Sequence, residues 1–437
     1  MPQVKLALVV QRYGTEINGG AELHARYIAE HLSVHADVRV LTTCARDYIT
    51  WRNELAPGEA LVNGVPVERF PVTREREKYD FARRSRRVFD YPHTLQDELD
   101  WIDSEGPCSP ALVERVVRSD DEFDFVILFS VRYHHAYHVA RAASRRAVLV
   151  PTAERDPALG VSAFQPIFRG VRAIMYNSPE ERALINAVSG NTTVPNVVVG
   201  VGSEVPSDVS GSRAREKFGI DGPYVVYVGR IDANKGFPEL FDHFARYLED
   251  GRTPLTLVLI GTPVVEIPIR PWIRHLGFVS DEDKFDVIAG SVALMMPSYY
   301  ESLSMVALEA WALGKPVIAN ARCDVLVGQC LRSGGGLYYQ DVSEFIGVLD
   351  AVRSEASLAE RLGRQGRRFY EDHYRWPLVE NAYLDMFARL SVEPPPPPME
   401  PLPGWFARRR RNRPPAAEVV AALPSGPVRP VTGVGSR

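Results

Sequence analysis

The alternation of strand-like and helix-like segments is the feature that most constrains the fold of this chain. Short apolar runs recur through most of the sequence, and segments with helical apolar spacing separate them. The clearest helical segment runs from Gly20 to Leu32, with Ala21, Ala25 and Ile28 on the same face as Leu32. This alternation is typical of parallel α/β layers, in which helices cover the faces of a sheet.

The strand-like runs fall into two series. We expect the strands of the first series at Val4–Val10, Val38–Thr42, Val65–Phe70, Phe125–Ser130, Ala147–Val150, Ala173–Asn177 and Val197–Val201. We expect those of the second at Tyr224–Val228, Leu255–Ile260, Ile273–Phe278, Ala293–Met296, Val317–Asn320 and Leu337–Tyr339. Between the series lies a linker-like stretch rich in Gly, Ser and Pro, Gly200–Ser212. The sequence therefore predicts two Rossmann-like domains that face a central cleft.

The domain boundaries follow from this pattern. We expect the first Rossmann-like domain over residues 1–202 and the second over 203–375. Pro377 should break the last helical stretch, so residues 376–390 are predicted as a separate helix that crosses back toward the first domain. Residues 391–437 hold 12 of the 34 prolines and are predicted to be a disordered Pro/Arg-rich tail.

The tail also differs from the rest of the chain in charge. The whole chain has a net charge of -4, whereas residues 391–437 hold 7 Lys+Arg and 3 Asp+Glu, a net +4. Trp405 and Phe406 precede a basic run from Arg408 to Arg413. An aromatic anchor beside basic residues suits peripheral contact with an anionic membrane, and the alternative is a solvated tail without a partner.

Composition excludes several classes of protein. Apolar residues make up 45% and charged residues 24%, which is ordinary for a globular protein, and no apolar run reaches the ~18 residues of a membrane span. The cysteines are scattered, so we expect no disulfide framework and a reducing, cytoplasmic location: Cys44, Cys108, Cys323 and Cys330. The basic stretch Arg74–Arg87 is predicted either as an exposed helix with charge pairs or as a surface for an anionic acceptor or membrane. We expect no nucleic-acid partner.

A glycine-rich loop, Gly14–Gly20, follows the first expected strand and precedes the first helix. Its glycines allow backbone N–H groups to approach a ligand, and the helix N-terminus favours an anion such as a phosphate. The loop is neither a P-loop, because Gly20 stands where lysine is needed, nor a GxGxxG motif. The alternative is that Gly19 and Gly20 only form a helix-start turn.

A second loop carries two cations at the mouth of the expected cleft. The strand Tyr224–Val228 leads into Gly229–Gly236, which contains Arg230 and Lys235. A guanidinium and an ammonium together can neutralise a leaving diphosphate without proton transfer. Either residue alone is more often a solvated loop cation.

Two glutamates eight residues apart follow the strand Ala293–Met296. If a helix begins near Ser302 or Leu303, Glu301 and Glu309 lie on the order of 12 Å apart along its axis. That span fits a diphosphate with a sugar at one end and a ribose at the other. The backbone N–H groups of Ser302, Leu303 and Ser304 would offer the helix terminus to the diphosphate. The alternative is a helix cap at Glu301 and a surface ion pair at Glu309.

Taken in order, these motifs resemble the retaining glycosyltransferases of family four, which have the GT-B fold. The resemblance covers nearly all of residues 1–390 and implies an acceptor domain followed by a nucleotide-sugar donor domain. It assigns the donor diphosphate to Arg230 and Lys235, and hydroxyls of the transferred sugar to Glu301. The other implied donor-binding residues are Glu309 for the ribose, Gly19 and Gly20 for the phosphate from the opposite domain, and Ser302, Leu303 and Ser304 through their backbone.

The resemblance implies a hexosyltransferase with retention of configuration. The expected donor is a nucleotide-diphosphate sugar of the GDP-mannose or UDP-hexose type, and the expected acceptor is a glycan or lipid-linked hydroxyl, as in polysaccharide biosynthesis. The enzyme would be cytoplasmic or peripheral on the inner face of the membrane, without a cofactor. The alternatives are a catalytically silent GT-B scaffold and a nucleotide-sugar epimerase.

The acceptor side departs from the family pattern. Many members have histidine at the end of the fourth strand, where this chain has Phe129 and Ser130, and Thr-x-His-Asp where it has Thr152-Ala153-Glu154-Arg155. We assign the acceptor side to His134 or Glu154, and the alternative is that His134 and His138 are packing or surface residues. A metal is not expected, because His134 and His138 are too few for a site and Asp281-x-Asp283 is the one DxD match, with helix-cap spacing.

Overall fold

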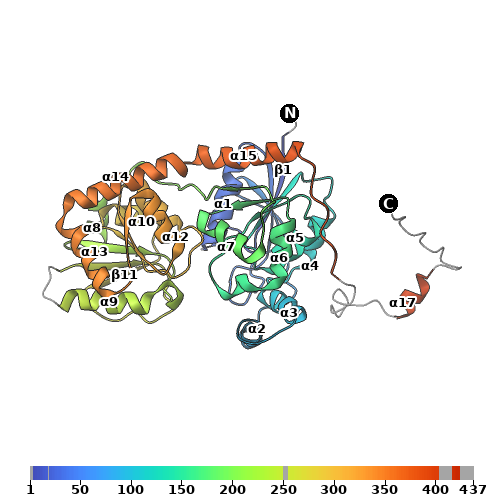
Figure 1. Ribbon diagram of the computed structural model, residues 1–437, viewed down its shortest axis with the longest axis horizontal. Helices are drawn as coiled ribbons and strands as arrows, with labels where there is room; N and C mark the ends of the chain where they lie inside the picture. The colour runs from blue at the N-terminus through green and yellow to red at the C-terminus, as the bar shows by residue number, and fades with distance from the viewer. Residues whose placement is uncertain (1–2, 18, 250–253, 403–415, 424–437) are drawn as a thin grey trace. The chain divides into compact units, whose positions relative to one another are not determined.

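The structure is a computed structural model that describes residues 3–17, 19–249, 254–402 and 416–423 (Figure 1). Residues 1–399 form one compact unit, and residues 400–437 form a second, in which helix α17 spans Ala416–Ala421. The predicted membrane anchor, Trp405 and Phe406 with the basic run Arg408–Arg413, lies outside the described residues.

The first sheet contains eight strands in the order β3-β4-β2-β1-β5-β6-β7-β8. All its strand pairs are parallel except β3 with β4. The strands are β1 (Lys5–Val9), β2 (Asp37–Thr43), β3 (Gly58–Val62), β4 (Val65–Phe70), β5 (Phe125–Phe129), β6 (Ala147–Val150), β7 (Ala173–Tyr176) and β8 (Asn196–Val198). The helices are α1 (Gly20–Leu32), α2 (Lys78–Asp90), α3 (Leu95–Glu105), α4 (Pro110–Val117), α5 (His134–Ala142), α6 (Gln165–Gly170) and α7 (Pro179–Ser189), with 3-10 turns η1 (Pro157–Gly160) and η2 (Ser162–Phe164).

The second sheet contains six strands in the order β11-β10-β9-β12-β13-β14, all parallel. The strands are β9 (Tyr224–Val228), β10 (Thr256–Ile260), β11 (Ile273–Gly277), β12 (Leu294–Met296), β13 (Val317–Asn320) and β14 (Gly336–Tyr339). The helices are α8 (Gly211–Phe218), α9 (Phe237–Glu249), α10 (Asp281–Gly290), α11 (Met305–Ala312), α12 (Asp324–Ser333), α13 (Val342–Ser354), α14 (Ala356–His373) and α15 (Trp376–Val392), with 3-10 turn η3 (Ala233–Lys235). Two Rossmann-like sheets are therefore present, as the alternation predicted.

Strand β3 was missed by the sequence analysis. It pairs antiparallel with β4 through a two-residue turn, Asn63-Gly64, in which both residues have positive φ (47° and 82°). Asn-Gly is the preferred pair for such a hairpin turn because these residues tolerate that conformation. The Asn-Gly pair was the signal that identifies this edge strand.

The chain leaves α14 at His373 and begins α15 at Trp376, next to the proline predicted to break the helix. Although α15 follows the second sheet in sequence, it packs on the first domain (Figure 1). Trp376 stacks on His31 of α1 with ring centroids 3.5 Å apart, and Phe387 stacks on Phe125 of β5 at 5.2 Å. The crossing helix thus joins the two domains.

The segment after α15 also contacts the first domain. The Arg172 guanidinium donates to the carbonyl oxygens of Leu390, Glu393 and Pro394, and Met399 N donates to Ser144 Oγ at 3.2 Å. Disorder was predicted from residue 391 onward on composition, but an arginine that caps a helix C-terminus holds residues 391–394 in place. Among the helices in the described part of the chain, none combines the length and apolar character needed to cross a bilayer.

Helix α2 begins at Lys78, inside the basic stretch Arg74–Arg87, and ends at Asp90. Arg83 and Arg84 pair with Asp80 on the same helix, at 2.5 Å and 2.7 Å. Such pairs within one helix are expected for an exposed helix with charge pairs, which was the first of the two interpretations of this stretch.

Candidate functional site

Two loops that follow neighbouring strands meet at the edge of the second sheet. Strands β9 and β12 are adjacent, so the loop 229–236 after β9 and the loop 297–304 after β12 emerge side by side. Gly236 has φ 76°, and a Cβ at this position would clash with the Pro297 carbonyl oxygen. A glycine here therefore allows the two loops to touch.

Lys235 and Glu301, one from each loop, form an ion pair. Lys235 Nζ lies 2.6 Å from Glu301 Oε1, with side-chain exposures of 23% and 15%. Burial opposes the charge on Lys235, but the carboxylates of Glu301 and Glu154 outweigh burial and raise the pKa of the ammonium. Lys235 is therefore cationic at neutral pH, which suits a phosphate-binding role.

Arg230, the other predicted cation, is held by two neighbours. Its Nε donates to the Asp232 carboxylate, and Asp232 also caps the η3 turn by accepting from Lys235 N at 3.0 Å. The Arg230 guanidinium lies 5.4 Å from the ring centroid of Tyr48, a residue of the first domain. A pocket lined by Tyr48, Arg230 and Asp232 lies at this point. Arg230 is thus placed where the two domains meet.

Helix α11 begins at Met305, two to three residues later than predicted. Ser304 is its N-cap, with a positive φ of 74°, and the Ser304 hydroxyl accepts from Ala307 N at 3.3 Å. This left-handed conformation ends the irregular segment that contains Ser302 and Leu303. Those two residues therefore lie before the helix rather than in its first turn. A positive φ at a residue other than glycine is strained, and such strain clusters at functional sites.

Glu309 lies in α11 and is 3% exposed. Its Oε1 accepts from Lys284 Nζ of α10 at 2.9 Å, whereas its buried Oε2 has no hydrogen-bond partner among the described residues. Burial raises the pKa of Glu309, and Lys284 opposes that shift. A buried carboxylate oxygen without a partner is costly, so Oε2 is poised to accept from a ligand hydroxyl.

The DxD match is engaged elsewhere. The Ser280 hydroxyl accepts from Asp283 N at 3.2 Å as the N-cap of α10. Asp283 pairs with Lys217 at 2.7 Å, and Asp281 pairs with Lys284 at 3.1 Å. The predicted helix cap is confirmed, and these carboxylates do not converge on one point.

Gly19 and Gly20 lie at the start of α1, with Gly19 as N-cap. The Glu22 carboxylate folds back against Gly19, where a Cβ would clash with it, and it forms a buried pair with Arg12 at 2.6 Å. Gly20 has open space at its Cβ position. Arg12 lies 5.5 Å from the Tyr48 ring, so the guanidinium groups of Arg12 and Arg230 both approach Tyr48. The glycine loop and the Arg230 loop are thus connected through Tyr48.

On the first domain, the ends of β5 and β6 carry strained residues. Ser130 has φ 64° and Thr152 has φ 46°, and the Thr152 hydroxyl donates to Ser130 Oγ at 2.8 Å. The loop then reaches Glu154. Burial raises the pKa of Glu154, Lys235 lowers it and Glu301 raises it, and the net shift is upward. Glu154 therefore faces the Lys235–Glu301 pair across the domain junction.

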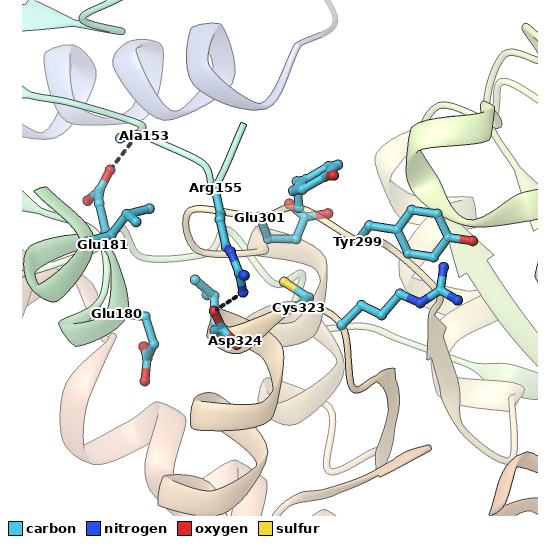
Figure 2. A pocket seen from close by; sticks show the side chains of 12 residues that line it. Ala153, Arg155, Glu180, Glu181, Tyr299, Glu301, Cys323 and Asp324 are labelled. Atoms are coloured by element: carbon cyan, nitrogen blue, oxygen red, sulfur yellow. Dashed lines mark hydrogen bonds and ion pairs between the residues drawn. The ribbon is translucent and has the colours of Figure 1, made fainter. Parts of the chain in front are cut away.

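A pocket between the domains lies beside this junction. Figure 2 shows Ala153, Arg155, Glu180 and Glu181 from the first domain opposite Tyr299, Glu301, Cys323 and Asp324 from the second. Glu181 Oε1 accepts from Ala153 N at 2.6 Å, and Arg155 pairs with Asp324 at 3.2 Å. Glu301, the first of the two predicted glutamates, thus lines a pocket that both domains build.

His134 has a different environment. It is 2% exposed, and its Nδ1 lies 3.1 Å from Asp103 Oδ1 of α3, within the first domain. The pocket between the domains is lined by other residues. The structure therefore places Glu154, but not His134, beside the Lys235–Glu301 pair.

Several residues of the site were missed by the sequence analysis. Asp232, Tyr48 and Lys284 each contact a predicted site residue. Arg12 and Glu181 contact Glu22 and Ala153, which lie next to predicted site residues. Asp232 sits within the Gly229–Gly236 motif and was identifiable there as a cap of the following turn. The others act across long sequence distances, and no local spacing signals them.

Comparison with known proteins agrees with the geometry. Residues 222–352 match the family model described as glycosyl transferases group 1, a segment that includes Arg230, Lys235, Glu301 and Glu309. The second domain of this chain is thus similar to the group 1 glycosyltransferases. This match agrees with the resemblance of the motifs to the retaining glycosyltransferases of family four.

Curated relatives match this chain over part of their length. The D-inositol 3-phosphate glycosyltransferase of Frankia alni is 27% identical over 275 residues, which is 58% of this chain and 64% of the relative. The alpha-maltose-1-phosphate synthase of Mycobacterium tuberculosis is 25% identical over 191 residues, 39% of this chain and 49% of the relative. The chain thus spans less than two thirds of the length of these relatives.

Solved structures share the fold. Sucrose-phosphate synthase from Thermosynechococcus elongatus has a TM-score of 0.65 at 17% identity and covers 89% of this chain and 100% of its own. HepE of Anabaena in complex with UDP-glucose has a TM-score of 0.63 at 17% identity and covers 88% of this chain and 99% of its own. The GT-B fold predicted from the resemblance is confirmed.

Proposed function

We propose that this chain is a metal-independent, retaining hexosyltransferase that uses a nucleotide-diphosphate sugar, of the UDP-hexose or GDP-mannose type, as donor. The Lys235–Glu301 ion pair carries the proposal. It brings together an ammonium, which would bind the diphosphate, and a carboxylate, which would accept from sugar hydroxyls, beside a carboxyl of the opposite domain. The relatives named above are sugar transferases and synthases, and HepE was solved with UDP-glucose, which supports this donor class.

In the proposed donor complex, the diphosphate lies between Lys235 and Arg230. Both cations are held in place before the donor arrives, Lys235 by Glu301 and Arg230 by Asp232. Preorganised charges stabilise a leaving group without the reorganisation that water requires. They supply the positive charge that a metal ion provides in DxD enzymes. Backbone groups of Gly19, Gly20 and the segment 302–304 complete this binding in the proposal.

Glu309 would bind the ribose. Its Oε2 lacks a partner among the described residues, while Lys284 fixes the other oxygen, so the carboxylate is oriented and still has an acceptor available. A ribose hydroxyl donating to Oε2 would satisfy it. Glu301 would accept from hydroxyls of the hexose once the diphosphate shares the charge of Lys235.

Glu154 would face the acceptor. Burial raises the pKa of its carboxyl, and the charge of Lys235 opposes that shift. In the proposed retaining reaction the acceptor hydroxyl attacks from the face that the diphosphate leaves, and the leaving phosphate accepts the proton. Glu154 would orient that hydroxyl, which belongs to a glycan or lipid-linked acceptor. His134 is bound to Asp103 and is given no acceptor contact here.

The test is nucleotide diphosphate release from a panel of UDP, GDP, ADP and dTDP hexoses. The proposal expects release with at least one hexose donor, and addition of Mg²⁺ or Mn²⁺ should leave the rate unchanged. Absence of release with every donor would favour a silent scaffold. Conversion of the donor sugar without an acceptor would favour an epimerase. Either result would contradict the proposal.

A further inference from the structure

Three metal-ligating side chains meet where the end of α3 faces the start of α5. Asp103 lies near the end of α3, and His134 and His138 lie in α5. His134 Nδ1 is 3.1 Å and His138 Nε2 is 3.2 Å from the same oxygen, Asp103 Oδ1. One ligand atom from each residue lies within 4.8 Å of the others. The three atoms are therefore close enough to share one ion.

The spacing of the two histidines suits chelation. Residues four apart on a helix lie on the same face, and the His134 and His138 ring centroids are 4.3 Å apart. Histidines at this spacing form the metal-binding pair of helical zinc motifs. In a tetrahedral zinc site with bonds of about 2.0 Å, ligand atoms lie about 3.3 Å apart. The two distances to Asp103 Oδ1 are close to that value.

The surroundings of the cluster favour a transition metal. The side chains are 2% (His134), 18% (Asp103) and 13% (His138) exposed, so the cluster is enclosed but within reach of water. Cys108 is half-buried beside the cluster and forms a hydrogen bond with His134. Imidazole and sulfur ligands select zinc-class ions over Mg²⁺ or Ca²⁺, which prefer oxygen.

We propose that Asp103, His134 and His138 bind one divalent transition-metal ion of the zinc class, with the fourth coordination position open to water. Binding would displace the ring protons through which the imidazoles donate to Asp103, because a metal binds the ring nitrogen that carries no proton. The ion would join α3 to α5. This site lies apart from Lys235 and Glu301, and the proposal does not depend on the donor assigned above.

The cluster is also linked to the segment after β6 that carries Glu154. Glu105, two residues after Asp103, accepts from Arg132 at 2.8 Å, and Arg132 donates to Asp156 at 2.8 Å. An ion that fixes the end of α3 would therefore also steady the segment after β6. Its predicted effect is structural: metal binding to the folded state raises the unfolding temperature.

The test uses the full-length chain, stripped with a chelator and dialysed. Isothermal titration with Zn²⁺ should show one tight equivalent, and Co²⁺ should give the absorption spectrum of a four-coordinate site. H138Q and D103N should lose this equivalent and the Zn²⁺-dependent rise in Tm. H373Q, which changes an exposed histidine at the end of α14, should keep both.

Two results would overturn the proposal. The first is a wild-type chain that binds no tight equivalent of Zn²⁺ or Co²⁺, which decides the matter even where a variant does not fold. The second is a tight equivalent retained by both H138Q and D103N with wild-type circular dichroism, because the ion would then be bound elsewhere. In either case the cluster would be a hydrogen-bonded network of Asp103 with two imidazoles.

Discussion

The two sides of the candidate site are built in different ways. On the second domain, Lys235 and Glu301 come from the loops that follow β9 and β12. These two strands are neighbours in the sheet, and the two residues form an ion pair. On the first domain, the segment after β6 that carries Glu154 is held by ion pairs between loops and a helix end, such as Arg132 with Glu105 and Asp156. The comparison teaches that a site made by loops after neighbouring strands can be found from the strand pattern and the loop motifs. A segment positioned by ion pairs between loops and helix ends carries no such pattern.

The largest effect should follow from removing the cation at the centre of the second-domain side. K235A should lower the catalytic efficiency with the donor by about 100-fold to 1,000-fold, as loss of one preorganised electrostatic contact does. Steady-state rates of nucleotide diphosphate release measure this. K217A is the matched control, because Lys217 is exposed and pairs with Asp283 rather than with a site residue. Equal losses of catalytic efficiency in K235A and K217A would contradict the assignment of Lys235 to the donor diphosphate.

A second test separates binding from stability at Glu309. E309Q and K284M each break the same buried pair, and each should lower the free energy of unfolding by on the order of 3 kcal/mol. Only Glu309 is assigned a contact with the nucleotide. Nucleotide affinity, measured by isothermal titration, should therefore fall more in E309Q than in K284M.

The reverse order of affinities would contradict the assignment of the ribose to Glu309. Urea unfolding of both variants provides the control, because it shows that the pair itself is broken to a similar extent. Donor hydrolysis at saturating donor then reports on chemistry apart from affinity.

The first-domain side can be tested through pH. Burial raises the pKa of Glu181 from its ordinary 4.5 to about 8. Between those values the folded state holds a proton that the unfolded state has released, so stability falls as pH rises, by at most about 1.4 kcal/mol per pH unit. E181Q should remove this slope between pH 5 and about 8. Urea unfolding at several pH values measures it, and identical slopes in both proteins would exclude Glu181 as the source.

The smallest effect concerns the contacts between the domains. Arg155 and Asp324 pair across the junction, but their side chains are 71% and 63% exposed. Such pairs contribute at most about 1 kcal/mol and weaken with salt. R155A should therefore change the unfolding free energy by less than that, and added salt should shrink the difference further. A loss of several kcal/mol would show that the junction is held by this pair.

Much of the fold was predictable because apolar periodicity specifies strands and helices directly. Both sheets followed from this periodicity, and the break before α15 followed from Pro377. Strand β3 was missed because its run is short and lies at the edge, where the Asn63-Gly64 turn was the stronger signal. The contacts of residues 391–399 were missed because composition says nothing of a partner such as Arg172.

The site was predictable only in part, for a similar reason. Arg230, Lys235, Glu301 and Glu309 stand in motifs whose order carries information. The start of α11 was placed too early because the left-handed conformation of Ser304 has no signal in a single sequence. The roles of Arg12, Tyr48 and Lys284 arise from tertiary contacts between distant segments, and no spacing of residues predicts them.

The central claim is that Glu301 binds the sugar while Lys235 and Glu309 bind the nucleotide part of one donor. The most direct measurement is isothermal titration of wild-type protein and E301Q with UDP and with UDP-glucose, or with the corresponding pair from the donor panel. We predict that E301Q binds the nucleotide diphosphate as wild type does and loses the added affinity for the sugar. Equal affinity of E301Q and wild type for the intact donor would contradict the account.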